Sequence, residues 1–465
     1  MRAPKRVNAS GHTMTARSSL RITLPAILVG ALALRWGYAL ILYFTMGDDG
    51  LMGLDSIDYL RFAKTFAADA AGGKLSGWQW LGANLHMMPF FTWLLAACFA
   101  IGDALGPLLY VLFQGVADTW TCFLVHRIAS QFDTRFAIPA AVAAAINPTQ
   151  IVMAGLAYSD TPFVAFVALS ILASLRWLAM PSGKNAILIG IGLGAATLFR
   201  VLILPWGFVS IAFLGIVALL RGNFRLRQAT QLAIAAIILS LSVAPVVLRN
   251  YTQYGALALT PQNGMHLTRW VVPLVKEAKD GTPWDQTYAL MEKRTEERFG
   301  PISPNPFENS RRYVEIGNEA MREMGVLPAI KAWAYGAAIN MASPGLLISP
   351  AVSQLPRTGF FATAGATMVE KIFNFVFRSD NARYAQLLLA GIVGVALIRL
   401  IQLAGLLALW RTGQSAALLL CAALIAYVLV LNGPVASPKY RLPVEPILNV
   451  LTGAGFALLA RRKAA

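Results

Sequence analysis

Charged residues are scarce in this sequence. Of its 465 residues, 13% are charged and 57% are hydrophobic, whereas about a quarter of the residues in ordinary soluble domains are charged. This composition excludes an ordinary soluble fold. The apolar residues come in blocks of about 20, the length that a transmembrane helix needs, and these blocks are apolar on nearly all sides. Four examples are residues 22–44, 162–180, 229–248 and 416–431.

Cysteine and histidine are also scarce. The three cysteines (Cys98, Cys122 and Cys421) lie in apolar blocks, and their odd number and wide spacing give neither a disulfide framework nor a zinc signature. The four histidines are scattered. The sequence also lacks a glycine-rich phosphate loop, a low-complexity run and an internal repeat. These absences exclude disulfide-stapled, zinc-binding, nucleotide-cradling and repeat proteins.

Acidic residues are few, at 22 against 39 lysines and arginines, which gives a net charge of +17. The basic residues stand at the ends of apolar blocks, as the positive-inside rule produces, rather than in one patch for nucleic acid. We therefore assign the excess to membrane topology and expect no nucleic-acid partner. The first apolar block is too long for a removed signal peptide and lacks its cleavage site, so we expect an uncleaved signal anchor.

Charge and hydropathy divide the chain into four parts. Residues 1–21 form a basic cytoplasmic N-terminus, and residues 22–248 form a transmembrane domain whose first external loop covers residues 46–86. Residues 249–383 hold 12 of the 22 acidic residues, as expected of an external, water-facing segment. Residues 384–465 form C-terminal transmembrane helices and a cytoplasmic tail. We expect an all-α polytopic membrane protein with ten to twelve transmembrane helices, an amphipathic helix in the first external loop and a mostly helical external segment.

The crossing count depends on the first third of the chain. Two apolar blocks, residues 87–101 and 108–125, lie between an external loop and the basic loop 126–135, where the charges allow one crossing. Either one block is re-entrant or the positive-inside rule fails at that loop.

The first external loop carries carboxylates at the start of a predicted helix. Asp55 is a good N-cap, and Asp58, three residues later, completes a capping box. Tyr59, Phe62 and Phe66 then share one helical face. Both carboxylates are therefore candidates for catalysis, with capping as the structural alternative.

Further charged residues stand beside apolar blocks. Asp160 ends the sequence Tyr-Ser-Asp just before one block, and Arg200 follows another. Charges within or beside membrane spans are costly and often functional. The structural alternatives are helix capping for Asp160 and snorkelling for Arg200.

Two basic sets lie at the external face. Arg249 and Asn250 precede the external segment, and Lys439 and Arg441 precede the last apolar block. Cations beside apolar helices suit a lipid-linked phosphate or pyrophosphate, and anchoring to lipid headgroups is the alternative.

The external segment contains two predicted amphipathic helices. The first begins near Thr282, and its stripe consists of Trp284, Tyr288, Met291, Thr295 and Phe299. The stripe of the second consists of Tyr313, Ile316, Ala320 and Met324. Trp270, Trp284 and Tyr288 are candidates to stack on sugar rings, although aromatic residues are also expected at a membrane interface.

In this order, the motifs resemble bacterial GT-C glycosyltransferases of the protein O-mannosyltransferase-like and aminoarabinose-transferase-like branch. The resemblance rests on DSIDYLRFA after the first apolar block, YSD before a later one, RNYTQYGALALTPQNGMHL after another, and KYRLPVEP before the last. It covers most of the chain, from Asp55 to Pro446. Each motif alone is weak, and their order gives the resemblance its specificity.

The resemblance implies an enzyme that transfers a sugar, with inversion, from a polyprenyl-phosphate donor to an acceptor hydroxyl. The expected location is the periplasmic face of a bacterial inner membrane. The family's catalytic carboxylate matches Asp55, but Ser56 stands where many relatives carry a second acid, so Asp58 competes as the base. Some relatives bind a divalent metal ion, so metal dependence stays open. Residue chemistry and resemblance together give three sets of candidates. The catalytic candidates are Asp55, Asp58 and Asp160. The candidates to bind the donor phosphate are Arg249, Lys439, Arg441 and Arg200, and the candidates to contact the substrate are Tyr59, Asn250 and His266.

Two other functions are compatible with the sequence. A lipid or solute transporter also carries charges in its spans, but usually near the midplane and between repeats. An oligosaccharide ligase or polymerase would use a pyrophosphate-linked donor, and His266 keeps this alternative open. The expected partners are a lipid-linked sugar donor, membrane lipids, and a glycan, lipid or protein acceptor.

Overall fold

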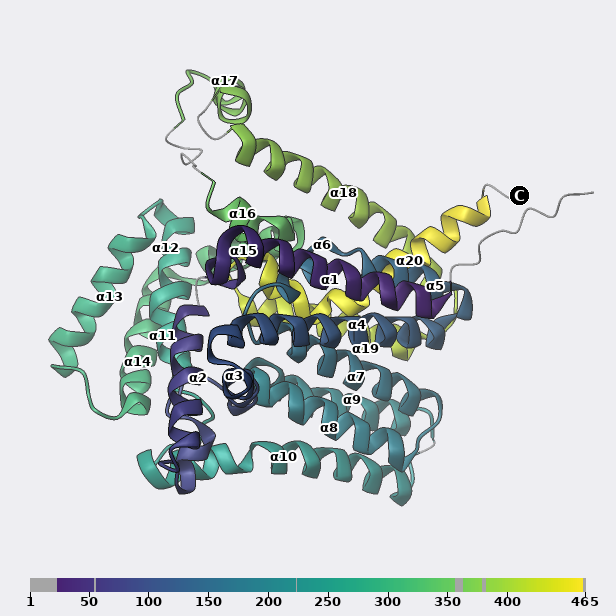
Figure 1. Ribbon diagram of the computed structural model, residues 1–465, viewed down its shortest axis with the longest axis horizontal. Helices are drawn as coiled ribbons and strands as arrows, with labels where there is room; N and C mark the ends of the chain where they lie inside the picture. The colour runs from purple at the N-terminus through teal and green to yellow at the C-terminus, as the bar shows by residue number, and fades with distance from the viewer. Residues whose placement is uncertain (1–22, 54–55, 223, 356–362, 379–381, 463–465) are drawn as a thin grey trace, which may run out of the picture.

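The computed structural model describes residues 23–53, 56–222, 224–355, 363–378 and 382–462. Within these residues the chain is helical and contains no strand (Figure 1). The first part supplies ten helices: α1 (Leu24–Met46), α2 (Ser56–Ala71), α3 (Pro89–Ile101), α4 (Gly106–Phe132), α5 (Thr134–Ala145), α6 (Pro148–Ala154), α7 (Asp160–Ala179), α8 (Gly183–Phe199), α9 (Leu204–Leu220) and α10 (Leu226–Tyr254).

The remaining helices form two groups: one within the segment predicted to be external, here named the external group, and one at the C-terminal end. The external group contains α11 (Gln262–His266), α12 (Val272–Asp280), α13 (Trp284–Phe299), α14 (Pro306–Met324), α15 (Val326–Ala342), α16 (Pro350–Ser353) and α17 (Met368–Phe373). The C-terminal group contains α18 (Ala382–Trp410), α19 (Ser415–Asn432) and α20 (Glu445–Arg462).

Eight helices in the described part of the chain are long and apolar enough to cross a membrane, and the bent pair α5–α6 gives a ninth if counted as one span. Two other apolar helices are shorter: α3 has 13 residues and α8 has 17. The expected fold class, an all-α polytopic membrane protein, is confirmed. Counting these two shorter helices as well gives ten or eleven, within the expected range of ten to twelve.

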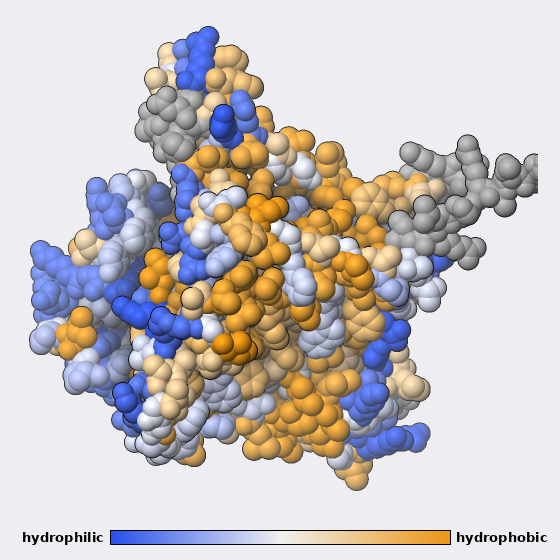
Figure 2. All heavy atoms as spheres, viewed as in Figure 1, coloured by the Kyte–Doolittle hydropathy of each residue, from blue (hydrophilic) through white to orange (hydrophobic). Residues whose placement is uncertain are grey.

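Hydrogen bonds between distant segments show which helix ends lie together. At one end of the bundle, here named the loop end, the N–H of Ala157 before α7 donates to the carbonyl of Leu51 after α1 (2.8 Å). At the opposite end, Arg221 after α9 donates to the carbonyl of Leu178 in the last turn of α7 (2.9 Å). Helices α11 to α14 extend beyond the loop end, on the left of Figure 1. Figure 2 shows hydrophilic residues over these helices and apolar residues over much of the bundle.

Helix α3 stays at the loop end. Near its start, Phe91 packs edge-on against Tyr59 of α2, with ring centroids 5.0 Å apart. Just beyond its last residue, Asp103 forms an ion pair with Lys64 of α2 (2.7 Å). Both ends of α3 therefore lie beside the same external helix, whereas α4, with 27 residues, is long enough to cross. Of the two apolar blocks that left the crossing count open, α4 is the one that is long and apolar enough to cross.

A buried ion pair supports the break between α5 and α6, whose axes differ by 51°. The break leaves the last carbonyls of α5 without helical partners, and such groups are costly inside a membrane. Arg35 of α1 donates to two of them, Ala144 (2.9 Å) and Ala145 (2.6 Å), and pairs with Asp118 of α4 (2.6 Å). Asn147 caps the start of α6.

Helices α12 to α14 share a small apolar core, which contains Val272, Met291, Ile316 and Ala320. Met291 and Ile316 belong to the two amphipathic stripes, so both stripes pack within the external group. The predicted helix from Thr282 begins at Trp284 instead, because Pro283 keeps an extended backbone (ψ 145°) before the first turn.

Candidate functional site

A pocket lies at the loop end, where four segments far apart in the sequence meet. It has an empty volume of about 530 Å³ and is partly open to solvent. The first external loop, the start of α7, the junction of α8 with α9 and the segment after α10 each contribute to it. Its lining residues are Tyr59, His86, Met87, Met88, Phe91, Ser159, Phe199, Arg200, Val201, Leu202, Thr260 and Gln262.

An ion pair between Asp160 and Arg200 stands at the wall of this pocket. Asp160 begins α7 and is 4% exposed, whereas the Arg200 side chain, which follows α8, is 23% exposed and lines the pocket. The helix dipole favours a carboxylate at the start of α7. Ser159 occupies the N-cap of α7 without a side-chain capping bond. Asp160 instead forms an ion pair with Arg200, and this pair joins the start of α7 to the end of α8.

The first external loop is fixed against the segment before α7. Ser56 donates through Oγ to the carbonyl of Ala157 (3.1 Å) and accepts from the N–H of Gly53 (2.9 Å). Only glycine fits at position 53, because a Cβ there would come 2.7 Å from Cε2 of Tyr158 and overlap its hydroxyl. Leu54 and the candidate Asp55 lie outside the described residues.

The other two candidates on α2 differ in position. The Asp58 side chain is 67% exposed and pairs with Arg61 (2.8 Å) on the same helix. Asp58 is not among the residues that line the pocket, whereas the next residue, Tyr59, is. The described contacts therefore associate Tyr59, but not Asp58, with the pocket.

Comparisons with family models and with curated proteins found no match, whereas the comparison with solved structures did. Among solved structures, it is similar to the oligosaccharyltransferase of Archaeoglobus fulgidus tethered with an acceptor peptide, with a TM-score of 0.51 and 14% identity over 94% of this chain and 50% of that one. The chain has a GT-C fold.

A second solved structure with this fold is ArnT from Cupriavidus metallidurans bound to undecaprenyl phosphate. Its TM-score is 0.39 and its identity is 15%, over 94% of this chain and 79% of that one. The chain spans half the length of the archaeal oligosaccharyltransferase. The expected resemblance to GT-C proteins is confirmed for the fold by the archaeal oligosaccharyltransferase.

Within this GT-C fold, Lys439 lies beside the Tyr-Ser-Asp segment. Its Nζ is 5.3 Å from the ring centroid of Tyr158 and 5.4 Å from that of Tyr440. An ammonium group above aromatic faces is attracted by their electron density. The segment before α20 therefore places one of the expected donor-phosphate cations next to the residues that carry Asp160.

The two other arginine candidates are engaged inside the protein. Arg441 is 3% exposed and forms an ion pair with Glu445 (2.6 Å), and its other nitrogens donate to the carbonyls of Asn340 (2.8 Å) and Ser343 (2.9 Å) and to Thr149 Oγ1 (3.0 Å). These bonds fasten the segment before α20 to α6 and α15.

Arg249 is similarly buried near the end of α10, at 2% exposed. It donates to the carbonyl of Gly82 (3.0 Å) and to Asn250 Oδ1 (2.9 Å). Asn250 in turn donates to the carbonyls of Ala258 (2.7 Å) and Leu259 (3.0 Å). These two candidates therefore join the first external loop to the segment after α10, which itself lines the pocket.

Two histidines occupy different positions near the pocket. His266, at the end of α11, is not among the lining residues, and burial lowers the pKa of its imidazole. His86 lines the pocket, and its pKa is lowered by burial and by the positive charge of Arg269. Sequence reasoning missed His86. Its place in the polar stretch just before the proline that opens α3 was the available signal.

Among the described residues, no group of three or more His, Cys, Asp or Glu side chains is placed to hold a metal ion.

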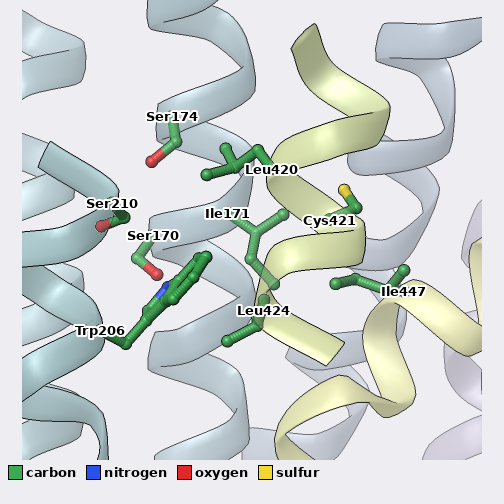
Figure 3. A pocket seen from close by; sticks show the side chains of 9 residues that line it. All are labelled: Ser170, Ile171, Ser174, Trp206, Ser210, Leu420, Cys421, Leu424 and Ile447. Carbon is green, nitrogen blue, oxygen red and sulfur yellow. The ribbon is translucent and has the colours of Figure 1, made fainter. Parts of the chain in front are cut away.

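A second, smaller cavity lies within the bundle, between α7, α9 and α19 (Figure 3). Two of its three serines are engaged by their own helices: Ser170 donates to the carbonyl of Val167 (2.7 Å) and Ser210 to that of Gly207 (2.9 Å). The remaining lining residues are mostly apolar, and none carries a charge. The loop-end pocket, which contains cationic and acidic groups, is the better candidate site.

Proposed function

We propose that this protein is a membrane glycosyltransferase that moves a sugar from a polyprenyl-phosphate donor to an acceptor hydroxyl at the loop-end pocket. The observation that carries the proposal is the Asp160–Arg200 pair at the wall of that pocket, within a GT-C fold. The pair joins a carboxylate, which can accept a proton, to a guanidinium, which suits a phosphate.

The distribution of charge supports an external location for this pocket. Basic residues gather at the opposite end of the bundle, which the positive-inside rule assigns to the cytoplasm. In a bacterial inner membrane, the loop end would then face the periplasm. The basic residues at the opposite end include Arg127, Arg135, Arg221, Arg225 and Arg411.

The proposed reaction needs one base and a cationic site for the leaving group. The acceptor hydroxyl oxygen attacks the anomeric carbon and its proton passes to a carboxylate, while the bond from that carbon to the phosphate oxygen breaks and the electron pair leaves with the phosphate. Attack from the opposite face inverts the anomeric centre. A phosphate can leave without a proton from a general acid. Cations that stabilise its developing negative charge therefore contribute most to the departure of the leaving group.

The described contacts favour a division of roles among the candidates. Arg200 and Lys439 are proposed to bind the donor phosphate, and a phosphate on Arg200 would compete with Asp160 and release its carboxylate to act as a base. Asp55 remains the base that the resemblance implies. Arg249 and Arg441, whose guanidinium groups bond to backbone carbonyls, are proposed to position the pocket walls rather than to bind the donor.

The test is sugar transfer by the purified full chain, with radiolabelled polyprenyl-phosphate sugars and a membrane extract as acceptor. Asp160→Asn and Asp55→Asn are compared with Asp58→Asn, a matched change at an exposed carboxylate. Loss of a catalytic base lowers the rate by about 100-fold or more, so we expect that loss in Asp160→Asn or Asp55→Asn and near wild-type transfer in Asp58→Asn. Full transfer in both of the first two variants would remove the carboxylate-base mechanism.

One observation favours a second candidate, an oligosaccharide ligase with a pyrophosphate-linked donor. The pocket holds a histidine, His86, in addition to Arg200. The two functions differ in the donor consumed. Turnover of a polyprenyl-pyrophosphate glycan, with none of the monophosphate donor, would favour the ligase.

A further inference from the structure

A cluster of aromatic and charged side chains stands on α13 and on the turn before α12, outside the pocket. Trp284, Tyr288 and Glu292 are spaced four residues apart, so they form one stripe along α13. The rings of Trp284 and Tyr288 are nearly parallel, at 15° with centroids 5.3 Å apart. Trp270 packs against Trp284 at 5.2 Å and is 46% exposed. We name these three aromatic residues, with Arg269 and Glu292, the aromatic shelf.

Arg269 and Glu292 form the polar edge of the shelf. The guanidinium carbon of Arg269 is 5.4 Å from the ring centroid of Tyr288, and its Nε is 3.5 Å from Glu292 Oε1, in an ion pair too long for a good hydrogen bond. The other Glu292 oxygen accepts from the hydroxyl of Tyr313 (2.9 Å). A ligand hydroxyl placed about 2.9 Å from both Nε and Oε1 would satisfy both groups at ordinary hydrogen-bond lengths.

Unmet hydrogen-bonding capacity is concentrated at the shelf. In the described part of the chain, six side-chain polar atoms are buried without a hydrogen bond. Three of them belong to the shelf residues Arg269, Trp284 and Glu292, and a fourth belongs to Thr287 on the same helix, α13. Such atoms are uncommon in proteins and each calls for an explanation. A polyhydroxylated ligand would supply the missing partners, with a small shift of the side chains that cover them.

The shelf adjoins the loop-end pocket. Gln262, at the start of α11, lines that pocket and donates to the carbonyl of His86 (2.8 Å), which also lines it. The turn that carries Arg269 and Trp270 follows α11 directly. The neighbouring surface carries exposed ion pairs, Arg294–Glu323 (3.1 Å) and Arg298–Glu319 (2.7 Å). Such a surface belongs in water rather than among lipid tails, so a hydrophilic partner fits the shelf better than the acyl region of a bilayer.

We propose that the aromatic shelf binds carbohydrate, as the subsite for a glycan that reaches the loop-end pocket. A sugar ring presents an apolar C–H face, which stacks on an aromatic ring, and a rim of hydroxyls, which pairs with the charged edge and with the indole N–H of Trp284. Only the identification of this glycan as the acceptor rests on the proposed function.

The direct test is equilibrium dialysis of the full chain in nanodiscs against tritiated maltotetraose and cellotetraose, without donor. We expect one of them to bind and Trp284→Ala to weaken that binding about tenfold, as expected for the loss of one stacked ring and one donor. Trp410→Ala is the matched control, because Trp410 is 68% exposed at the opposite end. The conservative Trp284→Phe variant, which keeps a ring but lacks the indole N–H, should bind more tightly than Trp284→Ala.

Two results would overturn the proposal: binding by neither tetrasaccharide, or equal binding by wild type and both Trp284 variants when each is monodisperse. Quenching of Trp284 fluorescence by brominated lipid, measured as the difference between wild type and Trp284→Phe, would place the shelf in the lipid interface instead and would also overturn it. The dialysis uses no donor, so it decides the shelf even if wild type transfers no sugar and the proposed function fails. Where transfer is observed, Trp284→Ala should raise the KM for the acceptor about tenfold, and an unchanged KM would contradict the acceptor role.

Discussion

Two arginine–aspartate pairs in this molecule have the same chemistry and opposite surroundings. Arg35 and Asp118 lie inside the bundle with side chains 0% and 3% exposed. Arg35 also donates to two carbonyls of α5, and Asp118 accepts from Gln150 (2.8 Å). Arg200, in the other pair, is 23% exposed and lines a pocket. A buried pair with all its hydrogen bonds made inside the fold holds helices together, whereas a pair at a pocket wall can exchange one partner for a ligand.

The largest expected effect separates these two roles by stability. Asp118→Asn leaves Arg35 charged and unpaired within the bundle, and breaking a buried pair in this way costs about 3–5 kcal/mol. We expect a marked fall in the unfolding temperature in detergent and a smaller monodisperse fraction. Asp160→Asn should lower the unfolding temperature less, because Arg200 remains partly in contact with solvent.

A double variant sharpens the same comparison. Arg35→Met with Asp118→Leu removes both charges, and apolar replacement of a buried pair is often close to neutral. In the double variant the unfolding temperature should return only part of the way to the wild-type value, because the carbonyls of Ala144 and Ala145 lose the donor that Arg35 provides. An unfolding temperature for Asp118→Asn equal to that of wild type would show that the Arg35–Asp118 pair contributes little, and the distinction between the two pairs would fail.

The next effect concerns the contact between Gly53 and Tyr158, close in sequence to Asp160 of the pocket pair. In Gly53→Ala the new methyl group overlaps the ring of Tyr158, which is 4% exposed and cannot easily move. Overpacking of this kind costs about 1–3 kcal/mol. We expect the first external loop to shift and transfer to fall, while the bundle, which the Arg35–Asp118 pair supports, stays folded. Gly37→Ala is the control, since a Cβ there meets nothing within 4 Å, and equal transfer by both variants would contradict the close fit at Tyr158.

The sequence was sufficient for the fold and for most of the segments that form the site, because apolar block length and flanking charge reflect the bilayer directly. It was insufficient for the pairing of Asp160 with Arg200, since 40 residues and two helices separate them. Arg441 and Arg200 were both candidates to bind the donor phosphate, and only packing shows that Arg441 is buried and bonded to carbonyls whereas Arg200 lines a pocket. The role of α3 was undecided because the flanking charges allowed one crossing for two apolar blocks, so that either one block was re-entrant or the positive-inside rule failed at the loop 126–135.

The smallest expected effect is a pH dependence of stability and of transfer through His86, which lines the pocket. Burial and the charge of Arg269 lower the pKa of His86, so the folded protein favours neutral imidazole more strongly than the unfolded chain does. The stability from this group is therefore fully present above the unfolded histidine pKa of about 6.5 and is lost as the pH falls through the lower folded value. His86→Asn should flatten part of the decline in unfolding temperature below that pH.

His266, whose pKa burial also lowers, contributes a separate part, so His266→Asn is the matched control for the stability measurement. Transfer distinguishes the two sites: protonation of His86 puts a third cation near Arg200 and Arg269, so the low-pH limb of the transfer profile should change in His86→Asn and not in His266→Asn. The same change in both variants would show that the limb does not report on the pocket.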